Sequence, residues 1–444
     1  MLRSHPPGVV HRRRRRASFG KGGQPENVTR GSSRACEHRG VDIRVRAIDE
    51  AEIPTWIRTD AAGFGEDADE LAQAERWIAA ELGRTRAAFD GIELVGTSRN
   101  HSFELTVPGG GSIPAAGVSA VAVLPTHRRL GILRAMMAAL LDDSAERSEP
   151  VSMLTASEGG IYRRFGFGIS SLALDVTLDV CDVEFARPRP AGRVRLVDRH
   201  ELERHAPALF DRVRRARPGA VSRPEVWWAD VHAPHKSGTR FDVLYESEGG
   251  RIDGFVTYAI KDRWDPEPAH VLNVRDLVAA SPAAEHALWR YLCEIDLVRT
   301  VKAAQVAVDT PLPWLLSAPR SGLFQPTSDY VWTRLLDVSG ALGARTYATA
   351  GRLVIAVSDP MRPGGAADGV FAIEGGPDGA AVAATDDAPD LACDVATLST
   401  VWLGGARWSV LASAGWVEEH TAGALATADA MFASIPKPFP FTWF

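Results

Sequence analysis

VAVLPTHRRLGILRAMMAALL, residues 121–141, is the stretch that decides how this chain folds. Its first four residues are apolar and largely β-branched, and Pro125 stops them, so they are typical of the end of a buried strand. The apolar period then changes from two to between three and four, which predicts a helix that begins near Gly131. The residues on its apolar face are Ile132, Leu133, Met136, Met137, Leu140 and Leu141.

The turn between this strand and helix suits a pyrophosphate. A helix start presents unpaired N–H groups and about half a positive charge. Arg128 and Arg129 add two guanidinium groups, and Gly131 lets the backbone approach an anion closely. The alternative interpretation is a surface turn with two solvated arginines.

The turn resembles the acetyl-CoA site of the GNAT acyltransferase superfamily, whose pattern is Gln or Arg, two residues, Gly, one residue, and Gly or Ala. Here the pattern runs Arg128-Arg-Leu-Gly131-Ile-Leu133, so the last position departs from it. A second stretch, LTASEGGIYRRFGFG at residues 154–168, adds to the match. Together the two stretches closely resemble the enhanced intracellular survival (Eis) family of N-acetyltransferases, over most of the chain after about residue 42.

The resemblance implies where acetyl-CoA binds. The backbone of Val121, Ala122 and Val123 would pair with the pantetheine amides and polarise the thioester carbonyl. Ser157 and Glu158 would complete the contact. The phosphates would be held by the turn and the first helical residues, Arg128, Arg129, Leu130, Gly131, Ile132, Leu133 and Arg134.

The resemblance also implies the catalytic groups. An alkylammonium has a pKa of about 10 and must lose a proton before it attacks a thioester. The α-carboxylate of Phe444 would be the general base. An exposed α-carboxyl group has a pKa of about 3.5, so burial or a water relay has to assist it. Tyr162 matches the family's tyrosine and would be the general acid that protonates the coenzyme A thiolate. Packing is the alternative role for this tyrosine.

The last residues, PKPFPFTWF, favour a docked tail even without the resemblance. Three prolines restrict the backbone, and four aromatic side chains gain free energy from burial. Phe64 and Trp77 are candidates for an acceptor pocket, although such aromatics more often lie in a core. Asp329 is a candidate partner for the acceptor ammonium, and a plain surface aspartate is the alternative.

The chain divides into four predicted parts. Residues 1–40 hold ten Lys or Arg against two Glu, which predicts a disordered tail, and no apolar run follows the arginines as it would in a signal peptide. The arginine run also suggests nucleic-acid binding, but without interleaved aromatics a loose tail or an upstream start codon is favoured. Residues 41–186 form the catalytic GNAT domain, closed by a strand around Leu172 to Leu178. A short helix is expected from Gly160. The fold class is α/β (α+β), with tandem GNAT-type mixed sheets flanked by helices.

Residues 187–338 repeat the pattern as a second GNAT-like domain. Its equivalent turn, Val278 to Glu285, contains neither arginine nor glycine, so we expect no coenzyme A there. Residues 339–444 resemble a sterol-carrier-protein-like domain that ends in the catalytic C-terminus. Its Trp402, Trp408 and Trp416 line a cavity or, more simply, pack in the core.

Composition narrows the function classes. No run of eighteen apolar residues exists, which excludes a membrane-spanning helix. The four cysteines lie far apart, which argues against a disulfide framework or a metal site and indicates a reduced, cytoplasmic compartment. Without the tail, 40 basic residues stand against 54 acidic ones. This negative charge suits the steering of a cationic acceptor, and solubility is the alternative explanation.

The sequence therefore predicts an acetyl-CoA-dependent N-acetyltransferase that uses no metal. Its partners would be a small-molecule amine, an aminoglycoside or a lysine-like polyamine, and other copies of itself, since the family forms hexamers. Two rival classes remain. One is a lipid or sterol carrier with a non-catalytic GNAT body. The other is an aminoacyl transferase, which would need a basic face for tRNA, and the net negative charge of the chain after the tail argues against it.

Overall fold

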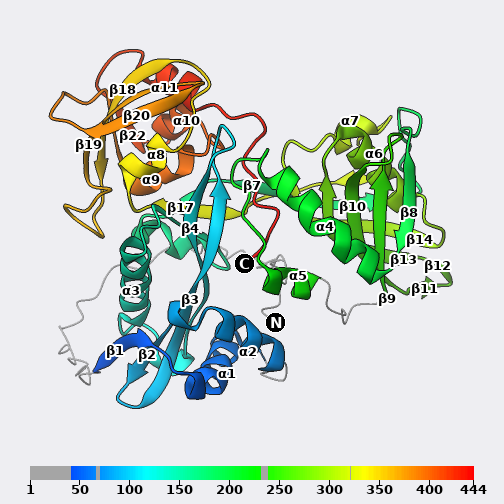
Figure 1. The fold of residues 1–444 in the computed structure, drawn as a ribbon, viewed down its shortest axis with the longest axis horizontal. Coiled ribbons are helices and arrows are strands. Elements are labelled where there is room, and N and C mark those ends of the chain that lie inside the picture. The colour runs from blue at the N-terminus through cyan, green and yellow to red at the C-terminus, as the bar shows by residue number, and fades with distance from the viewer. Residues whose placement is uncertain (1–41, 67–70, 232–238, 321) are drawn as a thin grey trace, which may run out of the picture.

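The computed structural model describes residues 42–66, 71–231, 239–320 and 322–444 (Figure 1). The predicted basic tail, residues 1–40, lies outside the described residues. Within the described ranges no helix is both long and apolar enough to cross a membrane. Three layered units of strands and helices are arranged around the C-terminal tail, residues 433–444, which runs in red from the third unit to the centre of the molecule.

The first unit is a seven-stranded sheet in the order β1-β2-β3-β4-β5-β17-β6. Along β2 the side chains of Ala87 and Phe89 pack under α1, whereas Ala88 packs under α3, so the two helices cover opposite faces. Every neighbouring pair is antiparallel except β4 and β5. The elements are β1 (Ile43–Ala47), α1 (Ile53–Phe64), α2 (Leu71–Ala80), β2 (Thr85–Asp90), β3 (Glu93–Thr106), β4 (Ser112–Val123), α3 (Ile132–Glu146), β5 (Val151–Thr155), β6 (Gly168–Ile169) and β17 (Val331–Leu335).

The second unit has the same kind of sheet, in the order β15-β7-β14-β13-β10-β9-β8, with β16 also paired to β7. Its parallel pair is β13 and β14. The elements are β7 (Leu172–Asp179), β8 (Arg193–Val197), α4 (Arg199–Arg214), α5 (Glu225–Val231), β9 (Thr239–Glu246), β10 (Ile252–Lys261), the hairpin β11 (Trp264–Asp265) and β12 (Glu267–Pro268), β13 (His270–Ala279), α6 (Pro282–Cys293), β14 (Val298–Ala307), α7 (Leu312–Leu315), β15 (Leu323–Phe324) and β16 (Thr327–Asp329).

Two local expectations were wrong. The strand around Leu172 to Leu178 does not close the first sheet; it is β7 of the second sheet, while β17 crosses back to lie between β5 and β6. Because β5 is buried on both faces, it needs a partner on each edge, and the later strand supplies the second one. The helix expected from Gly160 is replaced by two 3₁₀ turns, Gly159–Ile161 and Arg163–Phe165, since Gly166 ends the second turn in the left-handed region (φ 84°).

The third unit is a five-stranded sheet, β20-β19-β18-β21-β22, with helices packed against it. Trp402 and Trp408 lie in its core, as the packing interpretation predicts, whereas Trp416 is partly exposed and lines an open hollow of about 540 Å³. The elements are α8 (Val338–Gly343), β18 (Gly351–Ser358), β19 (Gly369–Gly376), β20 (Gly379–Ala384), β21 (Leu391–Asp394), α9 (Val395–Val401), α10 (Trp408–Ser413), β22 (Val417–Glu419) and α11 (Ala424–Phe432). The expected architecture of tandem GNAT-type sheets followed by an α+β unit is confirmed.

A buried ion pair joins the first unit to the third. Arg334 of β17 donates to both carboxylate oxygens of Asp359, at 3.0 and 2.8 Å, and neither side chain is more than 1% exposed. The guanidinium also donates to the carbonyl oxygens of Phe165 and Leu335. Each charge is therefore desolvated and depends on its partner.

We predict that Asp359→Asn lowers the free energy of unfolding by about 3–5 kcal/mol, because it leaves the Arg334 charge buried without a counter-charge. The measurement is equilibrium unfolding in urea. Asp387→Asn is the matched control, since Asp387 pairs with Arg352 at the surface and should change stability by less than about 1 kcal/mol. Equal losses in the two variants would contradict the argument.

Candidate functional site

The first unit opens where β4 separates from β5. The two strands pair in parallel only from Ala115–Val151 to Val118–Leu154, and β4 then continues to Val123 along β3 alone. Ala120 lies in the left-handed region (φ 51°), at a bulge that shifts the register between β3 and β4. Residues 121–123 therefore have one edge that β5 does not cover, where an extended ligand with amide groups can add as a strand.

The turn after β4 leads directly into α3. Gly131 is its N-cap with φ 82°, and a Cβ there would meet open space. No side chain of the described residues caps this helix, so its first N–H groups face outward. The side chains around the helix start divide by exposure. Arg128, Arg129, Leu130 and Arg134 are exposed, whereas Ile132 is buried in the core and Leu133 is partly buried.

Tyr162 lies beneath the loop that follows β5. Its side chain is 6% exposed and packs edge-on against Phe167, with ring centroids 6.2 Å apart. Burial, with a smaller contribution from the Glu158 carboxylate, raises the pKa of Tyr162 to about 12, so the phenol keeps its proton at neutral pH. Ser157 and Glu158 are exposed on the same loop.

The chain ends beside the point where β4 and β5 separate. Phe444 is 8% exposed, and its carboxyl oxygen accepts a hydrogen bond of 2.6 Å from the Oγ1 of Thr155, the last residue of β5. Its ring lies 5.0 Å from that of Phe103. Gly117 makes room for both rings, because a Cβ there would lie 2.3 Å from Phe103 and 3.2 Å from Phe444.

Arg223, from the second unit, holds the tail in this position. Its guanidinium donates to the carbonyl oxygen of Phe441 at 2.7 Å and to Thr442 Oγ1 at 2.9 Å. Asp276 of β13 forms an ion pair with it at 2.5 Å, and the Phe210 ring lies 4.1 Å from its central carbon. The sequence analysis missed this clamp, since its parts come from four separate stretches of the chain.

The aromatic candidates lie in different surroundings. Trp77 is packed, with its ring 4.5 Å from that of Trp227 of α5, which in turn lies 5.8 Å from Phe103. A chain of rings thus leads from Trp77 to Phe444. Phe64 is 44% exposed at the end of α1. This end lies close to β4, since a Cβ on the neighbouring Gly63 would be 2.6 Å from that of Ala122.

Asp329 is exposed on β16. It accepts a hydrogen bond of 2.6 Å from the indole of Trp332, and it lies 3.7 Å from where a Cβ of Gly159 would stand. It therefore lies beside the loop that carries Glu158 and leads to Tyr162. No three His, Cys, Asp or Glu side chains of the described ranges gather as metal ligands would.

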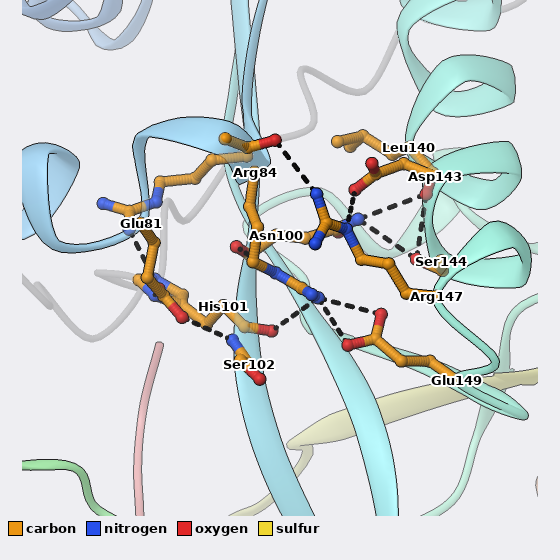
Figure 2. Close-up of polar contacts among 12 residues, drawn as sticks. Glu81, Arg84, Asn100, His101, Ser102, Leu140, Asp143, Ser144, Arg147 and Glu149 are labelled. Carbon is orange, nitrogen blue, oxygen red and sulfur yellow. Dashed lines mark hydrogen bonds and ion pairs between the residues drawn. The ribbon is translucent and has the colours of Figure 1, made fainter.

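A largely buried polar network links the segment after α2 to β3 and to α3 (Figure 2). Glu81, just after α2, accepts from Arg99 at 3.1 Å, from the backbone N–H of Ser102 at 2.8 Å and contacts His101 Nδ1 at 3.0 Å. Farther along, Arg84 donates to both oxygens of Glu149. The sequence carries a signal for this network that the predicted sites do not include, since the polar run Arg-Asn-His at residues 99–101 lies within the strand β3.

The second unit opens in the same way between β13 and β14, whose parallel pairing ends at Val274 and Ala303. A cavity of about 290 Å³ lies there. Glu285 of the first turn of α6 and the tail residues Phe439 and Phe441 line it. The expectation that this cleft takes no coenzyme A stays a prediction, and an acidic side chain stands where an anion would meet the helix start.

Comparison with known proteins shows which families and structures this chain is similar to. A model described as acetyltransferase (GNAT) domain matches residues 44–170, a second of the same description matches residues 219–335, and a sterol carrier protein domain matches residues 338–440. An uncharacterized N-acetyltransferase of Streptomyces avermitilis is 39% identical over 90% of this chain and 98% of its own. N-acetyltransferase Eis of Mycobacterium tuberculosis is 36% identical over 78% of this chain and 84% of its own. The crystal structure of Eis1 from Mycobacterium abscessus superposes with a TM-score of 0.79 at 33% identity, over 90% of this chain and all of that one.

Asp60 of α1 makes the stability of the native state depend on pH. Its side chain is buried and accepts from Thr97 Oγ1 at 2.9 Å, and burial raises its pKa to about 7. Because the folded chain holds this proton at a pH where the unfolded chain has lost it, the native state is destabilised as the pH rises from about 4 to about 7.

We predict that Asp60→Asn removes this destabilisation. At pH 8 the variant should be more stable than the native chain, by up to about 4 kcal/mol, and the difference should vanish near pH 4. Urea unfolding at several pH values measures it. Asp42→Asn, at an exposed ion pair with Arg44, is the control and should shift nothing between these pH values. A parallel pH dependence in the native chain and Asp60→Asn would contradict the assignment.

Proposed function

This chain belongs to the Eis-like family of GNAT N-acetyltransferases, and we propose that it transfers the acetyl group of acetyl-CoA to a primary amine, with the carboxylate of Phe444 as general base and Tyr162 as general acid. Acetyl transfer itself follows from the family. The acceptor and the two catalytic groups are the proposal. The observation that carries it is the buried C-terminus, whose carboxyl group meets Thr155 at the opening between β4 and β5.

Acetyl-CoA fits the opening in the first unit. Residues 121–123 offer the uncovered backbone edge for the pantetheine arm, and the outward N–H groups after Gly131 suit the pyrophosphate. Arg128, Arg129 and Arg134 are exposed around the helix start, whereas Ile132 and Leu133 would contribute through their amides alone. Ser157 and Glu158 lie on the opposite wall, after β5.

The base has to remove a proton from an alkylammonium before the amine attacks. A carboxylate shielded from water by Phe103 and its own ring interacts strongly with an ammonium, and Thr155 fixes one of its oxygens. The second oxygen is then available for the proton, directly or through a water molecule.

The acid acts as the tetrahedral intermediate collapses and the thiolate leaves. A phenol of pKa about 12 protonates a free thiolate of about 8.5 uphill, by roughly 5 kcal/mol. A thiolate enclosed beside Tyr162 is itself desolvated, which raises its proton affinity and reduces this difference. Tyr162 therefore serves first as a hydrogen-bond donor to the sulfur and transfers its proton as the thiolate forms. The proton that the new amide nitrogen loses then restores the phenol.

The proposed acceptor is an aminoglycoside or a lysine-like polyamine. Phe64 supplies an exposed ring near β4, Trp77 belongs to the aromatic chain that ends at Phe444, and Asp329 supplies a carboxylate beside the Tyr162 loop. A homohexameric assembly is part of the same proposal. The lipid-carrier alternative would place function in the hollow beside Trp416 instead, and turnover distinguishes the two.

The decisive experiment is release of free thiol from acetyl-CoA with a panel of primary amines. We expect the native chain to release thiol, and Tyr162→Phe and a chain extended by Gly-Ser-Gly after Phe444 to lose about 10²- to 10⁴-fold in kcat. Acetyl-CoA binding should stay unchanged in both. The same three residues added before Met1 are the control, and added formate should partly restore the extended chain by replacing the displaced carboxylate. A native chain that releases no thiol with any amine, or an extended chain with full activity, would contradict the proposal.

The Arg223 clamp gives a second test. We predict that Arg223→Met lowers kcat about ten- to a hundredfold, because the tail loses two hydrogen bonds and no longer holds the carboxylate at Thr155. The KM for acetyl-CoA should stay within twofold, and formate should restore part of kcat. Arg193→Met, at an exposed ion pair with Glu246, is the matched control and should leave kcat unchanged. A loss in Arg223→Met that formate cannot restore would mean that the clamp serves stability alone.

A further inference from the structure

The bulge of β4 lies directly before the backbone edge proposed for acetyl-CoA. Its residue Ala120 has a left-handed backbone (φ 51°), which costs a non-glycine residue free energy, so neighbouring groups have to hold it there. The register between β3 and β4 shifts at this point, and residues 121–123 follow at once. Whatever fixes the bulge therefore also fixes the course of this edge.

A buried threonine reaches the bulge from β3. The Oγ1 atom of Thr97 lies 3.1 Å from the carbonyl oxygen of Ala120 and 2.9 Å from Oδ1 of Asp60 on α1. Thr97 is fully buried, and Asp60 and Ala120 are each 6% exposed. Because water has little access to these three polar groups, they have to pair with one another.

The hydrogens available to the three groups depend on the charge of Asp60. A threonine hydroxyl has one hydrogen to donate and lone pairs with which to accept. When the carboxyl group is protonated, Asp60 donates to Thr97 and Thr97 donates to Ala120, so every group is paired. When it is ionised, two acceptors compete for the single hydroxyl hydrogen, and one of them loses it. The geometry is thus that of the protonated acid.

The helix α1 carries this acid against the same strand. Asp60 and Gly63 are three residues apart and lie on one face of the helix. A Cβ on Gly63 would stand 2.6 Å from the Cβ of Ala122 and 3.6 Å from the backbone nitrogen of Val123. The helix therefore reaches β4 at the bulge, through Thr97, and touches it again at the edge. A shift of the bulge changes the backbone that follows it.

The carboxyl group changes its charge near neutral pH. Burial raises the pKa of Asp60 to about 7, and Glu66 just after the helix acts in the same direction, whereas the hydrogen bond from β3 and the charge of Arg99 act against it. β4 has no titratable side chain. On α2, which packs against α1, Glu75 is partly exposed and Arg76 is exposed. Burial therefore outweighs the charges around this acid.

We propose that Asp60 and Thr97 position the donor edge: the protonated carboxyl group donates to Thr97, Thr97 donates to the carbonyl oxygen of Ala120, and the bulge so fixed sets residues 121–123 for the pantetheine amides of acetyl-CoA. Neither side chain touches the reacting atoms, so both are positioning residues. Loss of the proton takes the hydroxyl hydrogen from the Ala120 carbonyl, and acetyl-CoA binding weakens as the pH rises through neutrality. This inference rests on the proposed function, because it takes residues 121–123 as the donor edge.

Three variants separate the proton from the packing. In Asp60→Asn the side-chain amide donates to Thr97 at every pH, so it imitates the protonated acid. Thr97→Val keeps the shape of the side chain, but it leaves no hydroxyl to donate to Ala120 at any pH. Thr97→Ser keeps the hydroxyl and is the matched control for Thr97→Val.

The measurement is the Kd of acetyl-CoA by titration calorimetry without an amine, at pH 6 and at pH 8.5 and one ionic strength. We expect the Kd of the native chain to rise about three- to sevenfold more than that of Asp60→Asn, the range for one neutral hydrogen bond, and Thr97→Ser to follow the native chain. Thr97→Val should bind about as weakly at pH 6 as the native chain does at pH 8.5. Phosphates of the ligand titrate in this range as well, so the readout is the difference between native chain and variant.

Proton uptake gives a second readout. Binding of acetyl-CoA at pH 7.5, measured in buffers of different ionisation enthalpy, should draw about a quarter to a half of a proton more into the native chain than into Asp60→Asn. An equal pH dependence of Kd in the native chain and Asp60→Asn would overturn the inference. A Thr97→Val variant whose Kd follows that of the native chain at both pH values would overturn it too.

The outcomes for the two proposals are distinguishable. A native chain that releases thiol with an amine, while Asp60→Asn keeps the native pH dependence of binding, leaves the proposed function intact and removes Asp60 from it. A native chain whose acetyl-CoA binding depends on Asp60, but which releases no thiol with any amine, supports the donor edge and contradicts the proposed function.

Discussion

The separation of β4 from β5 after Val118 is the constraint on which the rest of the first unit depends. A strand that leaves its parallel neighbour carries backbone N–H and C=O groups that still need partners. On one wall of the opening those groups belong to residues 121–123, and on the other wall β5 ends at Thr155. A donor thioester bound along residues 121–123 would meet the end of the chain where these two walls face each other, so the proposed acid, the proposed base and the turn at residues 128–131 all lie around this opening.

That region is not the product of one unit. β17 completes the first sheet after the chain has already built the second, and Arg223 and Asp276 of the second unit hold the tail that leaves the third. The buried pair of Arg334 and Asp359 joins the first and third units. Because each unit supplies part of what positions Phe444, none of them is expected to form the complete site alone.

The sequence predicted the local features well, and the reason is that they are local. The turn at Arg128 to Gly131 and the helix after it follow from residue period and glycine chemistry within a dozen positions. The exchange of β7 and β17 between the two sheets could not be predicted from the sequence. The two strands have similar residue patterns, and which one joins the first sheet depends on which edge of β5 remains open. The clamp at Arg223 and the pair of Glu81 and His101 join stretches that are 20 to more than 200 residues apart, and no pattern along the chain brings them together. The two 3₁₀ turns near Tyr162 could in principle be predicted, because two glycines begin the first turn and Gly166 ends the second.

A terminal carboxylate differs from a side-chain base in what holds it. A glutamate is fixed by its own backbone, whereas the carboxyl group of Phe444 is only as well placed as the last dozen residues before it. The second unit can meet this requirement, because it contacts the tail, whether or not it binds coenzyme A. Its opening between β13 and β14 is lined by Phe439 and Phe441 of the tail. In the segment between α4 and α5, the carbonyl oxygen of Pro218 accepts a hydrogen bond from the backbone N–H of Phe439. The second GNAT-type sheet thus supplies the rigid support that a chain end would need in order to act as the proposed general base.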